Sequence, residues 1–191
     1  MRNIPLKQLR KICKLSQKSF GDFYDIPLKT IQNWEADTST KSSRSCPKYV
    51  EYLLMRSVLD DFHDEYIDYL IAKISERIHV EDKFTEAIRY ALNVIEDFKL
   101  NKYIDDVILY GSVSRNENKT SSDVDILVQF DERIKEVENY SIEINRLRGL
   151  ITSSDINLPE NDLHIVYGDD WKQNDEAYFL NIRKEGISLS N

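Results

Sequence analysis

Apolar residues recur three or four positions apart along most of the chain and alternate with polar residues in only a few short stretches. Helical spacing places side chains on one face of a helix, whereas alternation places them on one face of a strand. The pattern predicts helices over about residues 6–13, 16–24, 27–35, 49–59, 61–78, 81–100, 131–150 and 175–184, and strands at both ends of 107–128 and at 163–167.

Individual residues support the predicted starts of the second and third helices and the loop that follows them. Ser16 stands where an N-cap is expected, and the spacing then turns Phe20 and Phe23 inward. Pro27 occupies a favourable first-turn position for the third helix. The Ser/Thr-rich stretch Thr38–Pro47 predicts a loop rather than a domain linker.

The order of elements predicts an α+β chain with two domains. Residues 1–58 form an all-helical domain, residues 59–81 a helical connector and residues 82–191 a second domain that holds the strands. The boundary lies somewhere between residues 58 and 82. The sequence leaves open whether the connector joins the domains or forms a dimer contact.

Charge is divided unevenly between these parts. The chain of 191 residues has a formal net charge of −8, yet residues 1–56 hold 11 Lys and Arg against 5 Asp and Glu. The remaining residues hold 15 against 29. The N-terminal segment 1–56, called the head below, is therefore basic, and the rest of the chain is acidic. This division indicates that only the head binds an anionic polymer such as nucleic acid.

Other sequence features place the chain in the cytoplasm. No apolar run is long enough for a signal peptide or a membrane span. Cys13 and Cys46 lack metal-ligand spacing, so two free thiols in a reducing cytoplasm are expected.

The most informative stretch is Val107–Val128, in which a strand, a Gly-Ser turn and a polar loop lead to a strand with Asp123 and Asp125. Carboxylates two positions apart on a strand share a face, and the apolar residues between them face a core. Like charges held so close need a cation between them. Mg²⁺, which also holds substrate phosphates, is the usual one, so the pattern indicates metal-dependent phosphoryl or nucleotidyl transfer.

Gly111-Ser112, Arg115 and Ser122-Asp123-Val124-Asp125 together resemble the nucleotidyltransferase superfamily built on the polymerase-beta palm, and within it the minimal nucleotidyltransferases. The resemblance covers about residues 82–191 and implies a small mixed sheet. It implies that Gly111, Ser112, Arg115 and Ser122 bind the nucleotide, and that Asp123 and Asp125 are catalytic and bind Mg²⁺. The implied substrate is ATP or another NTP, and the sequence does not tell which base is preferred.

Two positions near this motif have alternative interpretations. Arg115 contacts phosphate or forms a surface salt bridge. Asn116 stands where the family often has Gly, and because Asn tolerates a left-handed backbone, the turn is expected to survive.

A full site in this superfamily has a third carboxylate, and Asp162 is the candidate. Alternation places Asp162, His164 and Val166 on one face, so His164 would neighbour the site. The alternative is that Asp162 only ends the preceding loop, in which case nucleotide binds without turnover.

The head resembles the helix-turn-helix of the phage-repressor (Xre/Cro) family over roughly residues 5–57. The resemblance implies that Gln17 touches a DNA phosphate and that the third helix enters the major groove. The long Ser-rich loop after residue 37 departs from a compact repressor, and a protein-binding helical bundle is the alternative. The implied DNA-binding residues are Gln17, Lys29, Thr30, Gln32 and Asn33.

Three functions remain open at this point. The first is transfer of a nucleoside monophosphate, AMP from ATP, to a hydroxyl acceptor, with a HEPN-type toxin as partner protein and the head autoregulating the operon. The second is a non-catalytic transcriptional repressor that binds nucleotide or a partner. The third is modification of a cationic small molecule such as an aminoglycoside. The oligomeric state is open as well, although repressor-like heads act as dimers.

Overall fold

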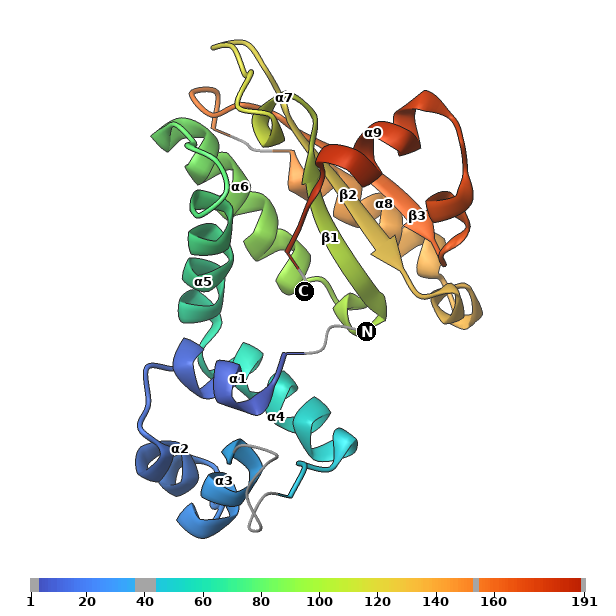
Figure 1. Cartoon of the computed structure of the whole chain (residues 1–191). Coiled ribbons are helices and arrows are strands. Elements are labelled where there is room, and N and C mark those ends of the chain that lie inside the picture. The colour runs from blue at the N-terminus through green and yellow to red at the C-terminus, as the bar shows by residue number, and fades with distance from the viewer. Residues whose placement is uncertain (1–3, 37–43, 153–154, 190–191) are drawn as a thin grey trace. The chain divides into compact units, whose positions relative to one another are not determined.

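The computed structural model describes residues 4–36, 44–152 and 155–189. Residues 37–43 of the predicted Ser/Thr-rich loop therefore lie outside the described part. The chain forms two compact units that divide between Tyr69 and Leu70 (Figure 1). No helix in the described ranges is long and apolar enough to cross a membrane.

The N-terminal unit is entirely helical in its described part. It comprises α1 (Leu6–Ile12), α2 (Gln17–Phe23), α3 (Leu28–Glu35), α4 (Lys48–Asp61) and the first part of α5 (His63–Ser75). Its core contains Leu9, Phe20, Ile31 and Val58, all fully buried. The periodicity of the sequence therefore predicted the helices and most of their inner faces.

Local details of this unit follow from its caps. The Ser16 hydroxyl accepts a hydrogen bond from the Ser19 amide at 3.0 Å, as an N-cap does. Pro27 is the N-cap of α3 and precedes the first turn by one residue. Phe23 is 53% exposed, although its spacing predicted an inward side chain; its ring packs 5.2 Å from that of Phe62 at the surface.

The C-terminal unit is built on a four-stranded mixed sheet. Its strands β1 (Ile104–Tyr110), β2 (Val124–Phe130), β3 (Asn161–Tyr167) and β4 (Ile187–Ser188) lie in the order β3-β2-β1-β4. β1 is antiparallel to β2 and to β4, while β2 and β3 are parallel. The predicted α+β architecture is thus confirmed.

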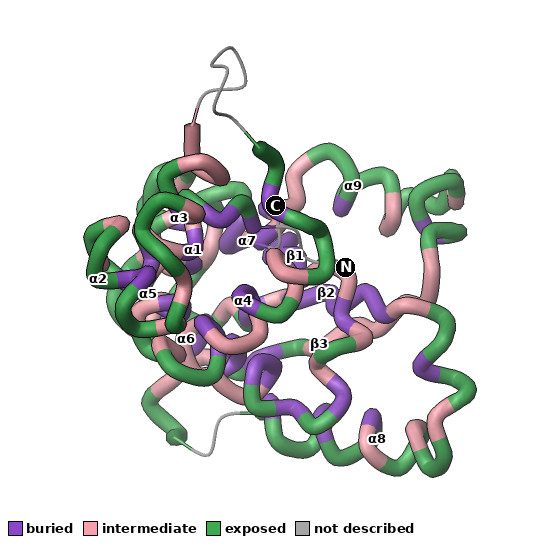
Figure 2. Tube along the Cα trace, turned by 90° about the horizontal axis from the view of Figure 1, so that it is seen from below, coloured by how far each residue is buried: buried purple, intermediate pink, exposed green. Residues whose placement is uncertain are grey.

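Helices cover both faces of this sheet (Figure 1). On one face α6 (Asp82–Glu96) and α8 (Tyr140–Ile151) pack together, α6 against β2 and β3 and α8 against β3. On the other lie α7 (Gly111–Ser114), the 3₁₀ turn η3 (Asp170–Gln173) and α9 (Ala177–Glu185). The apolar residues of β2 are buried on both faces, and Figure 2 colours the buried residues of the sheet purple.

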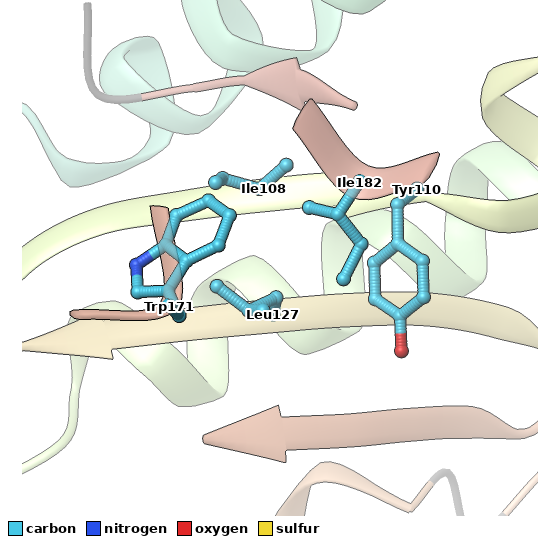
Figure 3. Close-up of a cluster of buried hydrophobic side chains, with 5 residues drawn as sticks. All are labelled: Ile108, Tyr110, Leu127, Trp171 and Ile182. Carbon is cyan, nitrogen blue, oxygen red and sulfur yellow. The ribbon is translucent and has the colours of Figure 1, made fainter. Parts of the chain in front are cut away.

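The α9 face has its own apolar cluster, which Figure 3 shows. Ile108 and Leu127 are paired residues of β1 and β2, so their side chains lie side by side. Trp171 from η3 and Ile182 from α9 pack onto them, with Tyr110 at one end. This cluster fixes α9 over the sheet.

The remaining differences from the prediction concern short segments. The single helix expected over 131–150 is instead two elements, the 3₁₀ helix η2 (Glu132–Glu136) and the α-helix α8. The break between them occurs because Asn139 has a left-handed backbone with φ 61°. β3 begins at Asn161, two residues earlier than its apolar pattern indicated. A 3₁₀ turn, η1 (Asn101–Tyr103), and the two-residue β4 were not predicted.

Candidate active site

Two of the predicted carboxylates are neighbours across the sheet. Asp125 of β2 pairs with Tyr110 of β1 on one side and with Asp162 of β3 on the other. Paired residues on adjacent strands point to the same face, so Tyr110, Asp125 and Asp162 form a row. Asp162 therefore lies within β3 rather than only ending the loop before it. Asp123 stands immediately before β2 and is exposed.

The charges of these carboxylates act on one another. Burial raises the pKa of Asp125, and the nearby carboxylates of Asp162 and Asp123 raise it further. His164 and Arg115 act in the opposite direction but do not offset these effects. The site is therefore an acidic cluster, in which a bound cation would offset the repulsion between the carboxylates.

Gly111 begins the turn after β1 and lies directly against Asp125. Its φ of +75° is in the left-handed region, and a Cβ at this position would lie 2.0 Å from Asp125 Oδ2. The carboxylate thus occupies the space that any other residue's Cβ would fill. This contact with Asp125, together with the left-handed backbone, makes glycine necessary at position 111.

The loop between the turn and β2 holds itself in place by short-range hydrogen bonds. The Ser122 hydroxyl accepts from the Lys119 amide at 2.8 Å, and Ser114 Oγ donates to the Gly111 carbonyl at 2.9 Å. Asn116 has the left-handed conformation expected of it, with φ 58°. Ser112, one residue beyond Gly111, is half-buried, and its carbonyl accepts from the Glu117 amide. Among the predicted nucleotide-binding residues, Ser122 thus already has a structural role.

Arg115 lies at the surface and pairs with two glutamates. Its Nε is 2.7 Å from Glu117 Oε2 and its Nη1 2.7 Å from Glu185 Oε1. Both ion pairs raise the pKa of the guanidinium. The salt-bridge interpretation of Arg115 therefore describes this structure, and the Glu185 contact ties the turn to the end of α9.

Sequence reasoning missed an aromatic network beside the carboxylates. The Tyr178 hydroxyl on α9 is 2.9 Å from the Tyr110 hydroxyl and 2.8 Å from His164 Nδ1. Burial raises the pKa of Tyr110, with contributions from the hydrogen bond to Tyr178 and from Asp125 and Asp162. His164 thus neighbours the site, as predicted. Tyr178 lies more than fifty residues from Asp125 and Tyr110, and no local pattern singles it out.

The donor set fits a magnesium ion that also contacts substrate. Mg²⁺ is usually held by one or two carboxylates together with substrate phosphates rather than by a complete protein cage. Asp125 and Asp162 are adjacent carboxylates that could supply two hard oxygen ligands, and the charge of Asp123 is close to them. Over the described ranges no three His, Cys, Asp or Glu side chains are grouped closely enough to hold a metal by themselves.

In the N-terminal unit the predicted DNA-binding residues have different environments. Lys29 and Gln32 of α3 are exposed, while Thr30 and Asn33 are half-buried. Gln17 instead donates through Nε2 to Glu35 Oε2 at 3.0 Å.

Glu35 is the centre of a second network that sequence reasoning missed. Its side chain is 2% exposed and receives Arg10 Nε at 2.7 Å and Arg10 Nη2 at 2.8 Å. Arg10 also donates to the Leu15 carbonyl. This ion pair joins α1, α2 and α3, and it uses the Gln17 side chain that was expected to contact a phosphate.

Comparison with known proteins agrees with the geometry of the C-terminal unit. A family model described as polymerase beta, nucleotidyltransferase matches residues 93–189, just over half of the chain. No curated protein matches the sequence. The matched segment contains the Gly111 turn, the three aspartates and α9. The chain therefore belongs to the polymerase-beta nucleotidyltransferase family.

Proposed function

We propose that the protein transfers a nucleoside monophosphate, AMP from ATP, to a hydroxyl acceptor. The observation that carries this proposal is the pairing of Asp125 with Asp162 directly beside the Gly111 turn. Two carboxylates for a metal and a turn that approaches a ligand closely are the parts that nucleotidyl transfer needs. The chain's membership in the nucleotidyltransferase family supports the same reaction class.

The roles of the residues follow from their positions. Asp125 and Asp162, with Asp123, would hold Mg²⁺, which supplies neutralisation of charge on the phosphates. The turn at Gly111 brings the backbone and the Ser112 hydroxyl close to those phosphates. The Tyr178 hydroxyl links the side chains of Tyr110 on β1 and His164 on β3 beside the carboxylates.

The experiment is label transfer from α-³²P-ATP with MgCl₂ and the full-length chain. Asp123→Asn is expected to abolish transfer while circular dichroism and unfolding remain those of the wild type. Asp170→Asn, an exposed aspartate in η3, is the matched control and should retain full activity. Transfer that persists in Asp123→Asn would eliminate the assigned chemistry.

We also propose that the N-terminal unit binds DNA as a helix-turn-helix. The exposed Lys29 and Gln32 on α3 support this role, since lysine neutralises phosphate and glutamine can pair with adenine. Replacing both by alanine should weaken binding to the protein's own promoter and lower the salt dependence by about one unit for the lost phosphate contact. Lys102→Ala, an exposed lysine of the other unit, is the control. Absence of binding by the wild type at low salt favours the protein-interaction alternative.

A HEPN-type toxin as the acceptor remains part of this proposal, because a DNA-binding head suits autoregulation of a two-gene operon. The gene beside this one is the place to look for a small helical protein. Incubation of that protein with the chain and labelled ATP tests the assignment. Label on the partner protein supports this assignment. If the chain is otherwise active but the partner stays unlabelled, the acceptor is a different molecule.

A further inference from the structure

Arg115 is held by two glutamates that come from different parts of the chain. Its Nε lies 2.7 Å from Glu117 Oε2, and its Nη1 lies 2.7 Å from Glu185 Oε1. Each contact uses one N–H group, and a guanidinium has further N–H groups that can donate to another oxygen ligand. The planar fork of arginine matches both carboxylate and phosphate. The two glutamates therefore occupy a side chain that is also suited to phosphate.

The position of Arg115 brings this ion-pair cluster to the candidate site. Arg115 is the C-cap of α7, the turn that begins at Gly111 directly against Asp125. The positive charge of Arg115 acts to lower the pKa of Asp125, so the guanidinium is within electrostatic reach of that carboxylate. A nucleotide whose phosphates lie at the Gly111 turn would therefore bring them close to Arg115.

Glu117 is brought to Arg115 by the short backbone turn between them. Asn116 has a left-handed backbone with φ 58°, and the Glu117 amide donates to the Ser112 carbonyl at 2.9 Å. The same turn that ends α7 thus fixes the backbone of one of the two glutamates.

Glu185 is held by a more extensive contact with the sheet. It ends α9, and the next residue, Gly186, lies directly on β1, where a Cβ would be 2.7 Å from Ile108 Cγ2. The Glu185 side chain is 21% exposed, whereas that of Glu117 is 65% exposed. Water and salt screen an exposed ion pair more strongly than a partly buried one. Glu185 should therefore contribute more than Glu117 to holding Arg115.

The charges around Arg115 do not favour an anionic ligand. Glu117 and Glu185 bring two negative charges to one guanidinium, so the ion-pair cluster as a whole is negative. The carboxylate of Asp125 lies nearby and has the same sign. A triphosphate at the Gly111 turn thus meets a cation that is already neutralised by the protein itself.

We infer that Glu117 and Glu185 restrain nucleotide binding, and that the phosphates of Mg·ATP bind by taking the Arg115 guanidinium from Glu185. The inference rests on the proposed function, which puts the phosphates at the Gly111 turn. Glu185 is then a positioning residue that acts through Arg115 and sets the affinity for the nucleotide. Only the partner of an ion pair is exchanged, and no covalent bond changes in this step.

The test measures the Kd of the magnesium complex of α,β-methylene-ATP by calorimetry on the full-length chain. This analogue has a methylene group in place of the oxygen that bridges the α- and β-phosphates, so it binds without transfer. Glu185→Gln removes the charge and keeps the size of the side chain. It should lower the Kd by about twofold to fivefold, the range that one exposed ion pair provides. Glu117→Gln should lower the Kd by less, because its ion pair is more exposed.

Glu143→Gln is the matched control for the loss of one paired glutamate. The Glu143 side chain is 18% exposed and pairs with Lys99 Nζ at 3.1 Å, on α8 at the other face of the sheet. This variant should leave the Kd unchanged. Unfolding midpoints confirm that all the variants fold.

Glu185→Gln in an Arg115→Gln background separates the release of Arg115 from the simple loss of a negative charge. The gain in affinity should be largely lost in this background, because no guanidinium is left to release. A role of Glu185 in folding alone would not produce this dependence on Arg115.

Three results would overturn the inference. An unchanged Kd in Glu185→Gln shows that the glutamate does not compete for Arg115, and a raised Kd shows that it orients Arg115 toward phosphate. An equal gain in the Arg115→Gln background assigns the effect to charge alone. Failure of the proposed function gives a different result, because the wild type then does not bind the magnesium complex of the analogue, or Asp123→Asn still transfers label from ATP.

Discussion

Gly111→Ala provides a direct test of the packing between the turn and the carboxylates. The added Cβ would lie 2.0 Å from Asp125 Oδ2 and 2.8 Å from Asp125 Cγ, so the carboxylate must move. A left-handed backbone costs an L-residue about 1–2 kcal/mol. Forcing an extra methyl group into occupied space costs about 1–3 kcal/mol more. We therefore expect a loss of about 2–5 kcal/mol in the free energy of unfolding, together with loss of label transfer, because Asp125 is displaced.

The stability of each unit can be followed separately by urea denaturation with 5-fluorotryptophan. The chain has two tryptophans, Trp34 in the N-terminal unit and Trp171 in the sheet unit, so each unit has its own ¹⁹F resonance. Gly149→Ala is the control, because a Cβ there meets nothing within 4 Å, and it should stabilise α8 by about 0.5–1 kcal/mol. In an Asp125→Ala background the cost of Gly111→Ala should fall toward the backbone strain alone. Equal costs in both backgrounds would refute the assigned contact.

Two further predictions concern the networks that local sequence patterns do not reveal. Glu35→Ala leaves Arg10 without its buried partner and should destabilise the N-terminal unit by about 3–5 kcal/mol in the Trp34 signal, while the Trp171 signal is unchanged. Tyr178→Phe removes a hydroxyl that bonds to Tyr110, which is 7% exposed, and should cost the sheet unit about 1–3 kcal/mol. Tyr103→Phe is the control, because the Tyr103 ring, which phenylalanine keeps, makes the contact with Lys102. It should change stability by less than about 0.5 kcal/mol. Equal effects of the two tyrosine variants would contradict a stabilising role for the Tyr178 hydroxyl.

Features determined by neighbouring residues were predictable from the sequence. Ser16 caps α2, Asn116 takes the left-handed conformation, and the alternation in β2 turns its aspartate away from the α6 face. Each of these depends on residues within four positions, where spacing and backbone preference decide the structure. The requirement for glycine at position 111 is different, because it comes from Asp125 on the neighbouring strand.

Contacts between distant residues that no family motif includes could not be predicted. Arg10 and Glu35 are 25 positions apart, and Tyr110 and Tyr178 are 68 apart. Such pairs come together only when the chain folds, and the periodicity of the sequence does not show which distant residue each one contacts. The prediction for Gln17 was made from its position at the start of α2, whereas its hydrogen bond goes to Glu35 at the end of α3. A candidate surface residue can thus be part of a structural network.

Acid is expected to act in opposite directions on the two units through Glu35 and Asp125. Burial alone would raise the pKa of Glu35, but hydrogen bonds from Arg10 and Gln17 and the charge of Arg10 lower it below its usual 4.5. The unfolded chain then binds more protons, so this contribution to stability is complete above pH 4.5 and is lost as pH falls through the folded pKa. For Asp125, burial and the neighbouring carboxylates raise the pKa above 3.8. The folded chain binds more protons, and stability is lost as pH rises through the folded pKa.

Comparison of variants isolates these two groups from all others that titrate. Without divalent ions, the Trp34 signal should show wild type more stable than Glu35→Gln at pH 7, with the difference shrinking below pH 4.5. In the Trp171 signal, Asp125→Asn should be more stable than wild type at pH 7, because it removes a charge that burial and neighbouring carboxylates disfavour, and this advantage should shrink as pH falls toward 3.8. Mg·ATP should reverse the order at pH 7, because only the wild type keeps the carboxylate that we propose binds the ion. If Asp125→Asn is less stable than wild type without the ion, the charge of Asp125 does not destabilise the folded unit. The argument that the carboxylates require a cation then fails.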